Sequence, residues 1–292
     1  MNSIYGVVTL YNPDIEEAAN NINRYLDHID RLLIWANSPI ENKDAFLDLL
    51  TDKSKAEFFQ SPDNSGVSKA VNEAIKRARD GGCRYLLTMD QDSTWPDFPG
   101  YVSKAIKLRE EDDAVTITGP YAVETGNGQL PEGFKTPGGV LYLEYVIVSG
   151  ALYDIAMFDK TGEFSEVYFI DATDEEMCLR AARYGYKHAV LGDCPMIHRF
   201  GEKKVHNILG IKITTHNYSP LRYYYSVRNH IWLIRCGYAP VSRRFKLFGR
   251  YVVKTFIRAL FFEDDRKAKI RQVFRGIRDG LSNEHRAEWR RC

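Results

Sequence analysis

The sequence predicts an α/β fold in which helices cover a mostly parallel sheet. Short apolar runs rich in β-branched residues, such as 4–10 and 31–35, alternate with segments whose apolar residues recur at helical spacing. The chain has 292 residues, which is enough for one large domain of this class. Because such sheets bind ligands beyond the carboxyl ends of their strands, the loops after Leu10, Trp35 and Met89 are candidates for one site.

The expected elements alternate regularly through the first third of the chain. A helix is expected after the first strand, where apolar residues between 15 and 33 recur at helical spacing. A helical stretch at 45–50 and an extended stretch at 56–61 come next. Residues 67–82 are expected to form a helix closed by two glycines, and 84–90 are expected to form a buried strand.

Beyond Pro96 the alternation weakens. Strands are expected at 115–123 and 138–150, on either side of a glycine-rich stretch. Residues 166–187 are expected to hold a strand end, a turn and a helix that ends near Gly185.

The end of the chain has a different character. An aromatic and basic stretch at 219–235 precedes two basic amphipathic helices, expected at about 242–261 and 266–281. We therefore expect an α/β domain at 1–232 and a basic helical region at 233–292.

Charge is polarised along the chain, although the formal net charge is only +1. Residues 233–292 contain 16 Lys and Arg against 6 Asp and Glu, and residues 1–232 contain 24 against 33. The basic region has three interpretations: helices that pack on the domain, a surface for anionic lipids, or a nucleic-acid site. The first two are favoured, and no nucleic-acid partner is expected.

The cysteines and the amino-terminal sequence indicate in which cellular compartment the protein is expected. The five cysteines lie far apart without a CxxC pair, so neither a disulfide framework nor a zinc site is expected. The amino terminus lacks the features of a signal peptide, and no window has the roughly 18 apolar residues of a spanning helix. We expect a cytoplasmic protein, and peripheral attachment at the inner face of the plasma membrane is a hypothesis that follows from the basic region.

Two aspartates separated by one residue, Asp90 and Asp92, follow the apolar strand RYLLTM. One explanation is structural, because Asp is common at turns and helix N-termini. The other is chemical: two hard oxygen ligands at the carboxyl end of a buried strand suit Mg²⁺ or Mn²⁺ holding a diphosphate. The cation would offset the repulsion between the two carboxylates.

A second acidic cluster occurs in FIDATDEEMCLR, with carboxylates at Asp171, Asp174, Glu175 and Glu176. Acids in the first turn of a helix are favoured by its dipole, which is a sufficient structural explanation. A carboxylate at a helix start beside a bound sugar can also act as a general base toward an acceptor hydroxyl.

Seven short motifs occur in a fixed order between about residues 4 and 230. They are GVVTLYNP (6–13), NSGVSKAVNEAI (64–75), LTMDQDS (87–93), IVSGALY (147–153), FIDATDEEMCLRAARYGY (169–186), HRFGE (198–202) and RYYYSVRN (222–229). Together they resemble the family 2 glycosyltransferases, particularly the bacterial rhamnosyltransferase-like subgroup. Each motif alone is weakly specific, whereas the ordered set covers most of the chain.

The resemblance implies a GT-A fold, a nucleotide-sugar donor such as a dTDP- or UDP-sugar, and a Mn²⁺ or Mg²⁺ cofactor. It implies transfer of rhamnose or a similar hexose, with inversion, to a hydroxyl of a growing cell-surface polysaccharide or lipid-linked glycan. A nucleotidyltransferase is the alternative enzyme, although TLYNPD after the first strand has neither the glycine nor the lysine of its signature loop. A non-enzymatic module that binds membrane or nucleic acid is the third hypothesis, and a homodimer is left open.

The resemblance also assigns roles by position. Asp174 is the expected base, and Asp90, Asp92 and His198 are the expected metal ligands. The acceptor side is expected to include Ser149, Gly150 and Asp171. The donor side is expected to include Thr9, Tyr11, Asn12, Asn64, Lys69, Asp90, Arg222, Arg228 and Asn229.

Some of these positions have structural alternatives. Tyr11 also fits an ordinary loop aromatic, His198 a structural histidine, and Ser149 with Gly150 a turn. The RYYYSVRN motif also fits an amphipathic helix with its two arginines on different faces.

The chain departs from the family pattern after its second strand. Ala36 replaces the aspartate that commonly pairs with the base of the donor, so Asn37 or stacking is expected to substitute. Thr173 and Glu176 likewise differ from the usual residues around the expected base.

Overall fold

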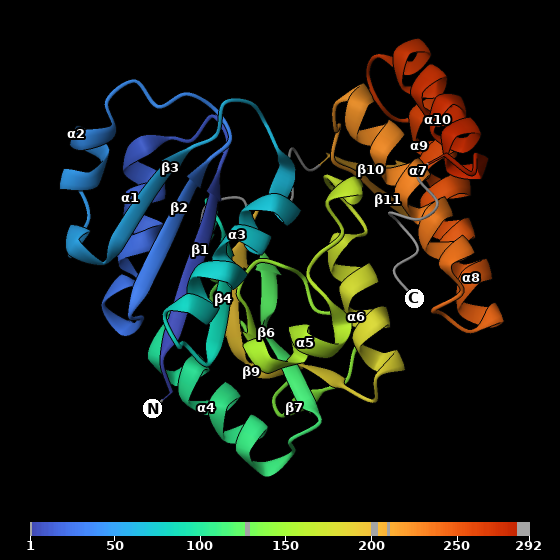
Figure 1. The fold of residues 1–292 in the computed structure, drawn as a ribbon. Coiled ribbons are helices and arrows are strands. Elements are labelled where there is room, and N and C mark those ends of the chain that lie inside the picture. The colour runs from blue at the N-terminus through green and yellow to red at the C-terminus, as the bar shows by residue number, and fades with distance from the viewer. Residues whose placement is uncertain (1, 126–128, 200–203, 209–210, 285–292) are drawn as a thin grey trace. The chain divides into compact units, whose positions relative to one another are not determined.

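The computed structural model describes residues 2–125, 129–199, 204–208 and 211–284, and these form two compact units (Figure 1). The sheet unit comprises Met1–Phe164 and Met177–Arg199, and the helical unit comprises Ser165–Glu176 and Phe200–Cys292. Part of the glycine-rich stretch (126–128) and part of the HRFGE motif (200–202) lie outside the described residues.

The two units divide the chain at other places than the sequence indicated. The expected boundary between 232 and 233 falls inside helix α7 (Pro220–Cys236). Helix α6 (Thr173–Arg183) belongs to both units, because its first turn counts with the helical unit and the rest with the sheet unit.

Within the described residues, nine strands form one mixed sheet in the order β3-β2-β1-β4-β8-β6-β9-β5, with β7 paired to β9. The first four neighbours in this order are parallel, and β8 is antiparallel to both β4 and β6. The α/β fold is therefore confirmed, with an antiparallel insertion. The strands are β1 (Ile4–Leu10), β2 (Arg31–Ala36), β3 (Ala56–Gln60), β4 (Tyr85–Asp90), β5 (Ser93–Thr94), β6 (Val115–Glu124), β7 (Val140–Leu141), β8 (Ala151–Asp154) and β9 (Lys187–His198).

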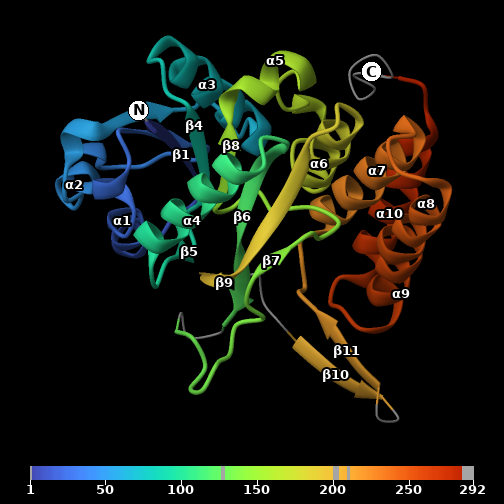
Figure 2. The same ribbon diagram turned by 90° about the horizontal axis from the view of Figure 1, so that it is seen from below.

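Helices cover both faces of this sheet. Because successive side chains of a strand point to opposite faces, residues of one strand pack in two different cores. Ile4 and Val8 pack in the core that includes α1 (Ile15–Asn23) and α4 (Phe98–Glu111). Tyr5 and Val7 pack in the core that includes α3 (Gly66–Asp80) and α5 (Phe158–Thr161). Figure 2 shows α1 and α4 on one side of the sheet and α3 and α5 on the other. A short helix, α2 (Lys43–Asp48), lies between β2 and β3 in the chain.

The expected strand at 138–150 is wrong. Only Val140–Leu141 form a strand there, and β8 begins immediately after Gly150. The apolar side chain that the pattern detected, Val146, is buried from an irregular segment. The carbonyl of Val148 accepts a hydrogen bond from the Thr88 hydroxyl. This side-chain bond takes the place of the backbone hydrogen bond that the carbonyl would accept in a strand.

Two long elements, α4 and β9, were not foreseen. The start of α4 carries an N-terminal signature, because the Asp97 carboxylate accepts from the Gly100 N–H and a proline stands in the first turn. The expected strand end near residue 166 is instead a 3₁₀ turn, Glu166–Tyr168.

The helical unit consists of α7, α8 (Val241–Phe248), α9 (Lys254–Phe261) and α10 (Arg266–Leu281), together with a hairpin of β10 (Lys204–Ile208) and β11 (Ile211–Thr215). A π-helical segment, Gly249–Val253, joins α8 to α9, so the expected helix at 242–261 is one run with a wider turn inside it. The helix expected at 266–281 is confirmed. Among the described residues, no helix has both the length and the apolar content that crossing a membrane requires.

Gly276 and Gly280 allow α10 to lie close against α7. A Cβ at Gly276 would lie 2.8 Å from the carbonyl oxygen of Tyr224, and one at Gly280 would lie 2.9 Å from Cβ of Ile231. The backbone of α10 therefore lies against the backbone of α7 at Gly276 and against the side chain of Ile231 at Gly280.

A substitution at Gly150 tests the turn that leads into β8. Gly150 has φ +78°, and a Cβ there would lie 2.7 Å from Sδ of Met196 and 2.8 Å from Cγ of Pro120. We expect Gly150→Ala to lower the free energy of unfolding in urea by about 3 kcal/mol or more, from backbone strain plus overpacking. The matched control is Gly82→Ala, with φ +66° and no atom within 4 Å of the added Cβ. It should lose only about 1–2 kcal/mol, and equal losses would contradict the overpacking.

Candidate functional site

The carboxyl ends of β1 and β4 lie side by side and are tied to each other. Thr9 pairs in register with Asp90. The side chain of Gln91 accepts from the Tyr11 N–H at 2.7 Å and donates to the Tyr11 carbonyl at 3.2 Å. Asn21 donates to the Gln91 carbonyl at 2.9 Å. The loop after β1 is thus fixed against the loop after β4, which places Thr9 and Tyr11 next to Asp90.

The loop after β1 continues through Asn12, which has a left-handed backbone with φ 45°. Its N–H donates to the Ser38 hydroxyl at 2.6 Å, so the end of β2 holds this turn. Tyr11 leaves 53% of its surface exposed, which keeps its ring available to a ligand. Gln91, Asn21 and Ser38 are site-building residues that the sequence did not reveal.

Asn37 is buried, and its polar groups are used within the protein. Its Oδ1 accepts from Trp35 Nε1 at 3.0 Å and from the N–H and hydroxyl of Ser65 at 3.1 and 3.0 Å. Its Nδ2 donates to the Gly66 carbonyl at 3.3 Å. These bonds tie the end of β2 to the start of α3 and favour a positioning role for Asn37 over a base contact.

Asn64 and Lys69 lie at the start of α3, and both are exposed. The Asn64 side chain accepts from the Gly66 N–H at 3.1 Å. The first turn of α3 carries no acidic residue. Donor contact by these two residues stays a prediction.

Asp90, Asp92 and His198 form a cluster whose potential ligand atoms all lie within 4.8 Å of one another. Nδ1 of His198 lies 3.4 Å from Oδ1 of Asp92. His198 reaches the cluster because Ser93 of β5 pairs with His198 at the end of β9. Two carboxylates and one imidazole are a donor set that suits Mn²⁺, and Mg²⁺ accepts the carboxylate oxygens. The three residues predicted as metal ligands are therefore brought together.

Two buried serines lie beneath this cluster. The Ser93 hydroxyl is 2.7 Å from Nδ1 of His198 and 2.7 Å from the Ser149 hydroxyl. The Ser149 hydroxyl accepts from the Asp90 N–H at 3.1 Å. A chain of hydrogen bonds therefore joins the backbone of one expected metal ligand to the ring of another. Ser149, expected on the acceptor side, thus contacts the cluster of Asp90, Asp92 and His198 through its hydrogen bonds, and Ser93 was missed although it ends the LTMDQDS motif.

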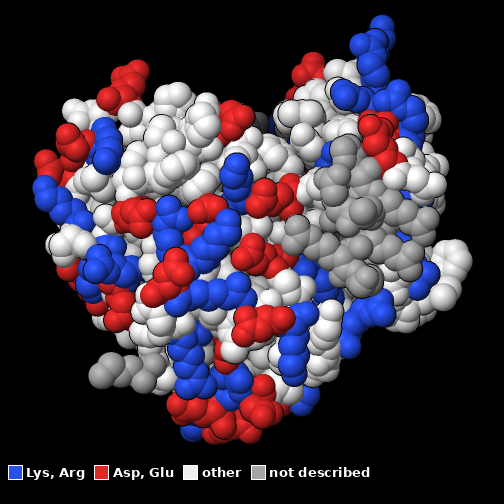
Figure 3. Space-filling model, in the orientation of Figure 1, with Lys and Arg blue, Asp and Glu red and all other residues white. Residues whose placement is uncertain are grey.

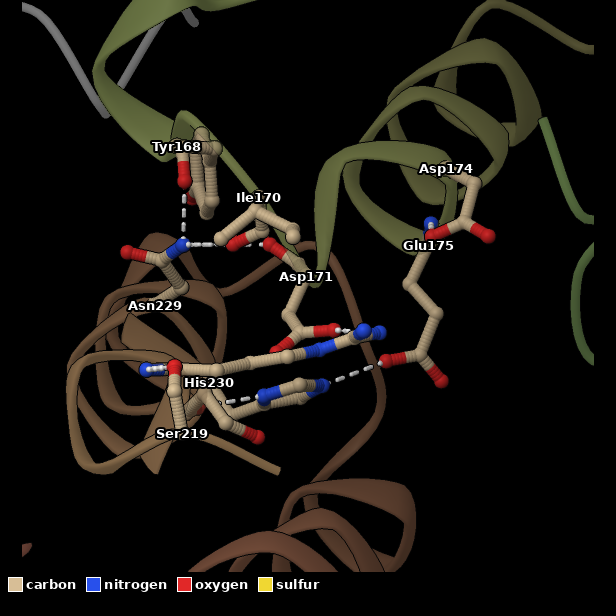
Figure 4. Close-up of polar contacts among 10 residues, drawn as sticks. Tyr168, Ile170, Asp171, Asp174, Glu175, Ser219, Asn229 and His230 are labelled. Atoms are coloured by element: carbon tan, nitrogen blue, oxygen red, sulfur yellow. Dashed lines mark hydrogen bonds and ion pairs between the residues drawn. The ribbon is translucent and has the colours of Figure 1, made fainter. Parts of the chain in front are cut away.

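In the helical unit, the acidic loop before α6 has an unusual backbone. Phe169, Asp171 and Ala172 have φ of 55°, 61° and 64°, a region that costs non-glycine residues free energy. The buried amide of Asn229 donates to the carbonyls of Tyr168, Ile170 (2.7 Å) and Asp171 (3.1 Å), as Figure 4 shows. One side chain thus holds the strained loop in place.

The two arginines of the RYYYSVRN motif bond within the same unit. Arg228 donates to Oδ1 of Asn229 at 2.9 and 2.8 Å and to the Val167 carbonyl at 2.7 Å, and it stacks over Trp232. Nη2 of Arg222 lies 3.2 Å from Oδ1 of Asp171. These contacts make Arg228 and Asn229 supports of the acidic loop, whereas the structure leaves their predicted contact with the donor untested.

Asp174 occupies the first turn of α6 (Figure 4). Withdrawal from water raises the pKa of Asp174 to about 7, and the charge of Glu175 acts in the same direction. A carboxyl that titrates near neutral pH is suited to accept a proton at physiological pH.

The neighbour of Asp174, Glu175, is paired with a buried histidine. Oε2 of Glu175 lies 3.1 Å from Nε2 of His230, and Nδ1 of His230 lies 2.6 Å from the Ser226 carbonyl. Because a carbonyl oxygen only accepts, Nδ1 must carry a hydrogen. The Glu175 and His230 side chains therefore form a buried polar pair through Nε2 of the ring. This pair fixes the start of α6 and was not foreseen from the sequence.

The mixed sheet, with two carboxylates and a histidine at its strand ends, is the arrangement expected of the GT-A class. The model of glycosyl transferase family 2 matches residues 8–157, and the chain belongs to that family. Membership sets aside the nucleotidyltransferase and the non-enzymatic module.

Individual relatives agree with this assignment. The chain is 28% identical over 293 residues to the dTDP-rhamnosyl transferase RfbF of Shigella flexneri, covering 95% of this chain and 94% of the relative. Among solved structures, S. aureus TarS 1–349 matches 98% of this chain and 82% of its own, at 15% identity and a TM-score of 0.61. The mannosyltransferase PcManGT of Pyrobaculum calidifontis, in complex with GDP-Man and Mn²⁺, matches 94% and 74% at 14% identity and a TM-score of 0.58. The two structures show that the fold is shared.

Removal of the Asn229 amide tests its role in holding the acidic loop. Asn229→Ala leaves buried carbonyls without a donor, so we expect a loss of about 2–4 kcal/mol in the free energy of unfolding. Urea denaturation measures it, and hydrogen exchange should show faster opening of residues 168–176. The matched control is Asn20→Ala, at an exposed position of α1, which should change stability by about 0.5 kcal/mol or less. An Asn229→Ala variant as stable as this control would refute the role.

Proposed function

We propose that this glycosyltransferase moves rhamnose or a similar hexose from a dTDP-sugar to a hydroxyl of a cell-surface polysaccharide or lipid-linked glycan. The observation that carries the proposal is the relative named a dTDP-rhamnosyl transferase, which aligns over 95% of this chain and 94% of its own length. A UDP-sugar is the second candidate donor. Transfer proceeds with inversion at the anomeric carbon.

The proposed cofactor is Mn²⁺ or Mg²⁺, held by Asp90, Asp92 and His198. The support is the proximity of their ligand atoms, within 4.8 Å of one another, and the Mn²⁺ in the complex of PcManGT. Such a cation neutralises charge on the diphosphate of the donor. The buried serines beneath the cluster orient the two ligands that they contact, Asp90 and His198.

The proposed nucleoside contacts are Thr9, Tyr11 and Asn12, with Asn64 and Lys69 nearer the base or ribose. The support for Tyr11 is an exposed ring on a backbone that Gln91 fixes from both sides. Such a ring can stack on a base without losing much conformational freedom on binding. Stacking would also compensate for Ala36, which is fully buried and offers no polar side chain.

The proposed base is Asp174. Its carboxylate accepts the proton of the acceptor hydroxyl as that oxygen forms a bond to the anomeric carbon. The bond between this carbon and the diphosphate oxygen breaks, and the nucleoside diphosphate departs with the electron pair. A single base suffices for this displacement, whereas glycosidases require two acids across the bond. Arg222 is proposed to hold the diphosphate or an acceptor phosphate. Asp171, whose Oδ1 lies 3.2 Å from Nη2 of Arg222, is proposed to lie on the acceptor side.

A donor screen tests the proposal directly. In the presence of Mn²⁺, dTDP-rhamnose should raise the melting temperature more than UDP-glucose or GDP-mannose, because a ligand that binds only the folded protein stabilises it. Stabilisation by UDP- or GDP-sugars without any by dTDP-rhamnose would overturn the assignment of the donor.

Replacement of Asp92 tests the metal cluster. Asp92→Ala removes one of three ligands, so we expect Mn²⁺ affinity, measured by electron paramagnetic resonance of free Mn²⁺, to fall by roughly tenfold or more. The matched control is Asp63→Ala, at an exposed loop position of the sheet unit, which should keep the affinity of the unmodified protein. Unchanged Mn²⁺ binding in Asp92→Ala would remove Asp92 from the site.

Replacement of Asp174 separates chemistry from donor binding. Asp174→Asn should keep the affinity for dTDP-rhamnose and lower its turnover, measured as dTDP release, by about 10²–10⁴-fold. The matched control is Asp113→Asn, at an exposed position, which should retain full turnover. Full turnover in Asp174→Asn would eliminate it as the base.

The pH profile gives a second readout for Asp174. Because only the carboxylate accepts a proton, turnover should rise as the pH increases through about 7 and then level off. The effect of Asp174 on the free energy of unfolding depends on pH in the opposite direction to turnover. A pKa raised by folding stabilises the protein fully below pH 3.8 and loses that effect as the pH rises through about 7. A flat turnover profile between pH 5 and 8 would contradict this assignment.

A further inference from the structure

A row of large apolar side chains lies exposed along α8, the π-helical segment and α9. Phe245 is 74% exposed and Phe261 is 60% exposed. We call this row the α8–α9 strip, and its members are Val241, Phe245, Phe248, Val253, Ile257 and Phe261. Contiguous exposed apolar surface of this kind marks an interaction site more often than isolated apolar residues do.

The π-helical segment keeps the strip on one face. Within α8 and within α9 the strip residues are three or four apart, as on one side of an α-helix. The single step of five, from Phe248 to Val253, coincides with the π-helical segment. In a regular α-helix, five residues would turn the second half of the strip away by roughly 140°. A π-helical turn brings residues five apart onto the same side, so the strip stays continuous.

The strip is distinct from the face by which these helices pack. Leu247, Val252 and Ala259 are buried, and the last two belong to the core shared with α7 and α10. The same helical run therefore has one apolar face for the core of the helical unit and a second apolar face that stays uncovered. Core packing, one of the interpretations of the basic region, explains only the first.

The helical run that carries the strip has charged residues of one sign only. Residues 241–262 contain six basic residues and no Asp or Glu. They are Arg243, Arg244, Lys246, Arg250, Lys254 and Arg258. On the face shown in Figure 3, by contrast, acidic and basic side chains intermingle over the sheet unit. Lys246, Arg250 and Lys254 are exposed and recur every four residues beside the strip.

We propose that the α8–α9 strip binds the surface of an anionic lipid bilayer. The helical run spans 21 residues, or roughly 30 Å, and would lie in the plane of the bilayer. Its phenylalanines enter the interfacial region, and the long Lys and Arg side chains reach lipid phosphates. A second copy docking through the same face would set six cations against six, which opposes that alternative. Nucleic acid would leave the apolar strip without a partner.

Vesicle sedimentation of the full chain tests the proposal without donor or metal, so its outcome is independent of the proposed catalysis. The protein should sediment with phosphatidylglycerol-containing vesicles and stay in solution with phosphatidylcholine vesicles, and added salt should weaken the binding. We expect two double variants to bind these vesicles at least roughly tenfold more weakly than the unmodified chain. The apolar variant is Phe245→Ser with Phe261→Ser, and the charge variant is Lys246→Glu with Lys254→Glu.

Matched variants on the sheet unit control for exposure and net charge. Tyr142→Ser is an exposed aromatic change, and Lys43→Glu with Lys107→Glu changes the net charge as much as the charge variant does. Both should bind like the unmodified chain, and circular dichroism should show that all variants are folded. Failure to bind anionic vesicles would overturn the proposal, as would equal binding by the strip variants and their controls. Two other outcomes would assign the strip to another partner, provided that the protein does not bind vesicles. If the chain is a dimer and the apolar variant is a monomer, the strip binds a second copy. If the chain binds DNA and the charge variant does not, the strip region binds nucleic acid.

Discussion

The repulsion between Asp90 and Asp92 is the constraint around which the candidate site of the sheet unit is built. Asp90 is the last residue of β4 and Asp92 follows it, and β4 has β1 on one side and β8 on the other. Both carboxylates are half-buried, so water offsets part of their repulsion, and a cation or a hydrogen-bond donor reduces it further. The fold supplies His198 from the end of β9, through the pairing of that strand with Ser93. The irregular segment before Gly150 places Ser149 beneath the cluster, where it accepts from the Asp90 backbone. The ligands of the cluster and the serine that supports them thus come from the ends of β4 and β9 and from the segment before Gly150.

The helical unit contains a second constraint, the strained loop that precedes α6, and it stabilises this loop by hydrogen bonds. Three non-glycine residues there have positive φ, and their cost is offset by bonds from α7. Asn229 donates to the loop carbonyls, Arg228 donates to Asn229, and the His230 ring pairs with Glu175. Three consecutive residues of one helix thus fix the backbone and the charge next to Asp174. Backbone strain held in this way is common where a side chain must be presented in one geometry.

The sequence predicted those elements whose signals are local. Strand β4 and helix α10 were found nearly to the residue, because apolar runs and helical spacing depend only on neighbouring residues. The strand expected at 138–150 was wrong, because Val146 is buried there without the backbone pairing of a strand. Asp90, Asp92 and His198 were predicted as ligands from motifs, and they do come together. The roles of Ser93 and Asn229 were missed, since their partners lie 105 and about 60 positions away and only packing brings them close.

We propose that a divalent cation on Asp90, Asp92 and His198 holds the donor sugar nucleotide. Isothermal titration calorimetry of the full chain with dTDP-rhamnose tests it most directly, once with Mn²⁺ present and once after chelation. We expect binding with Mn²⁺ and an affinity at least roughly tenfold lower without it, because the charge of the diphosphate then faces two unneutralised carboxylates. Equal affinity in the two titrations would contradict it.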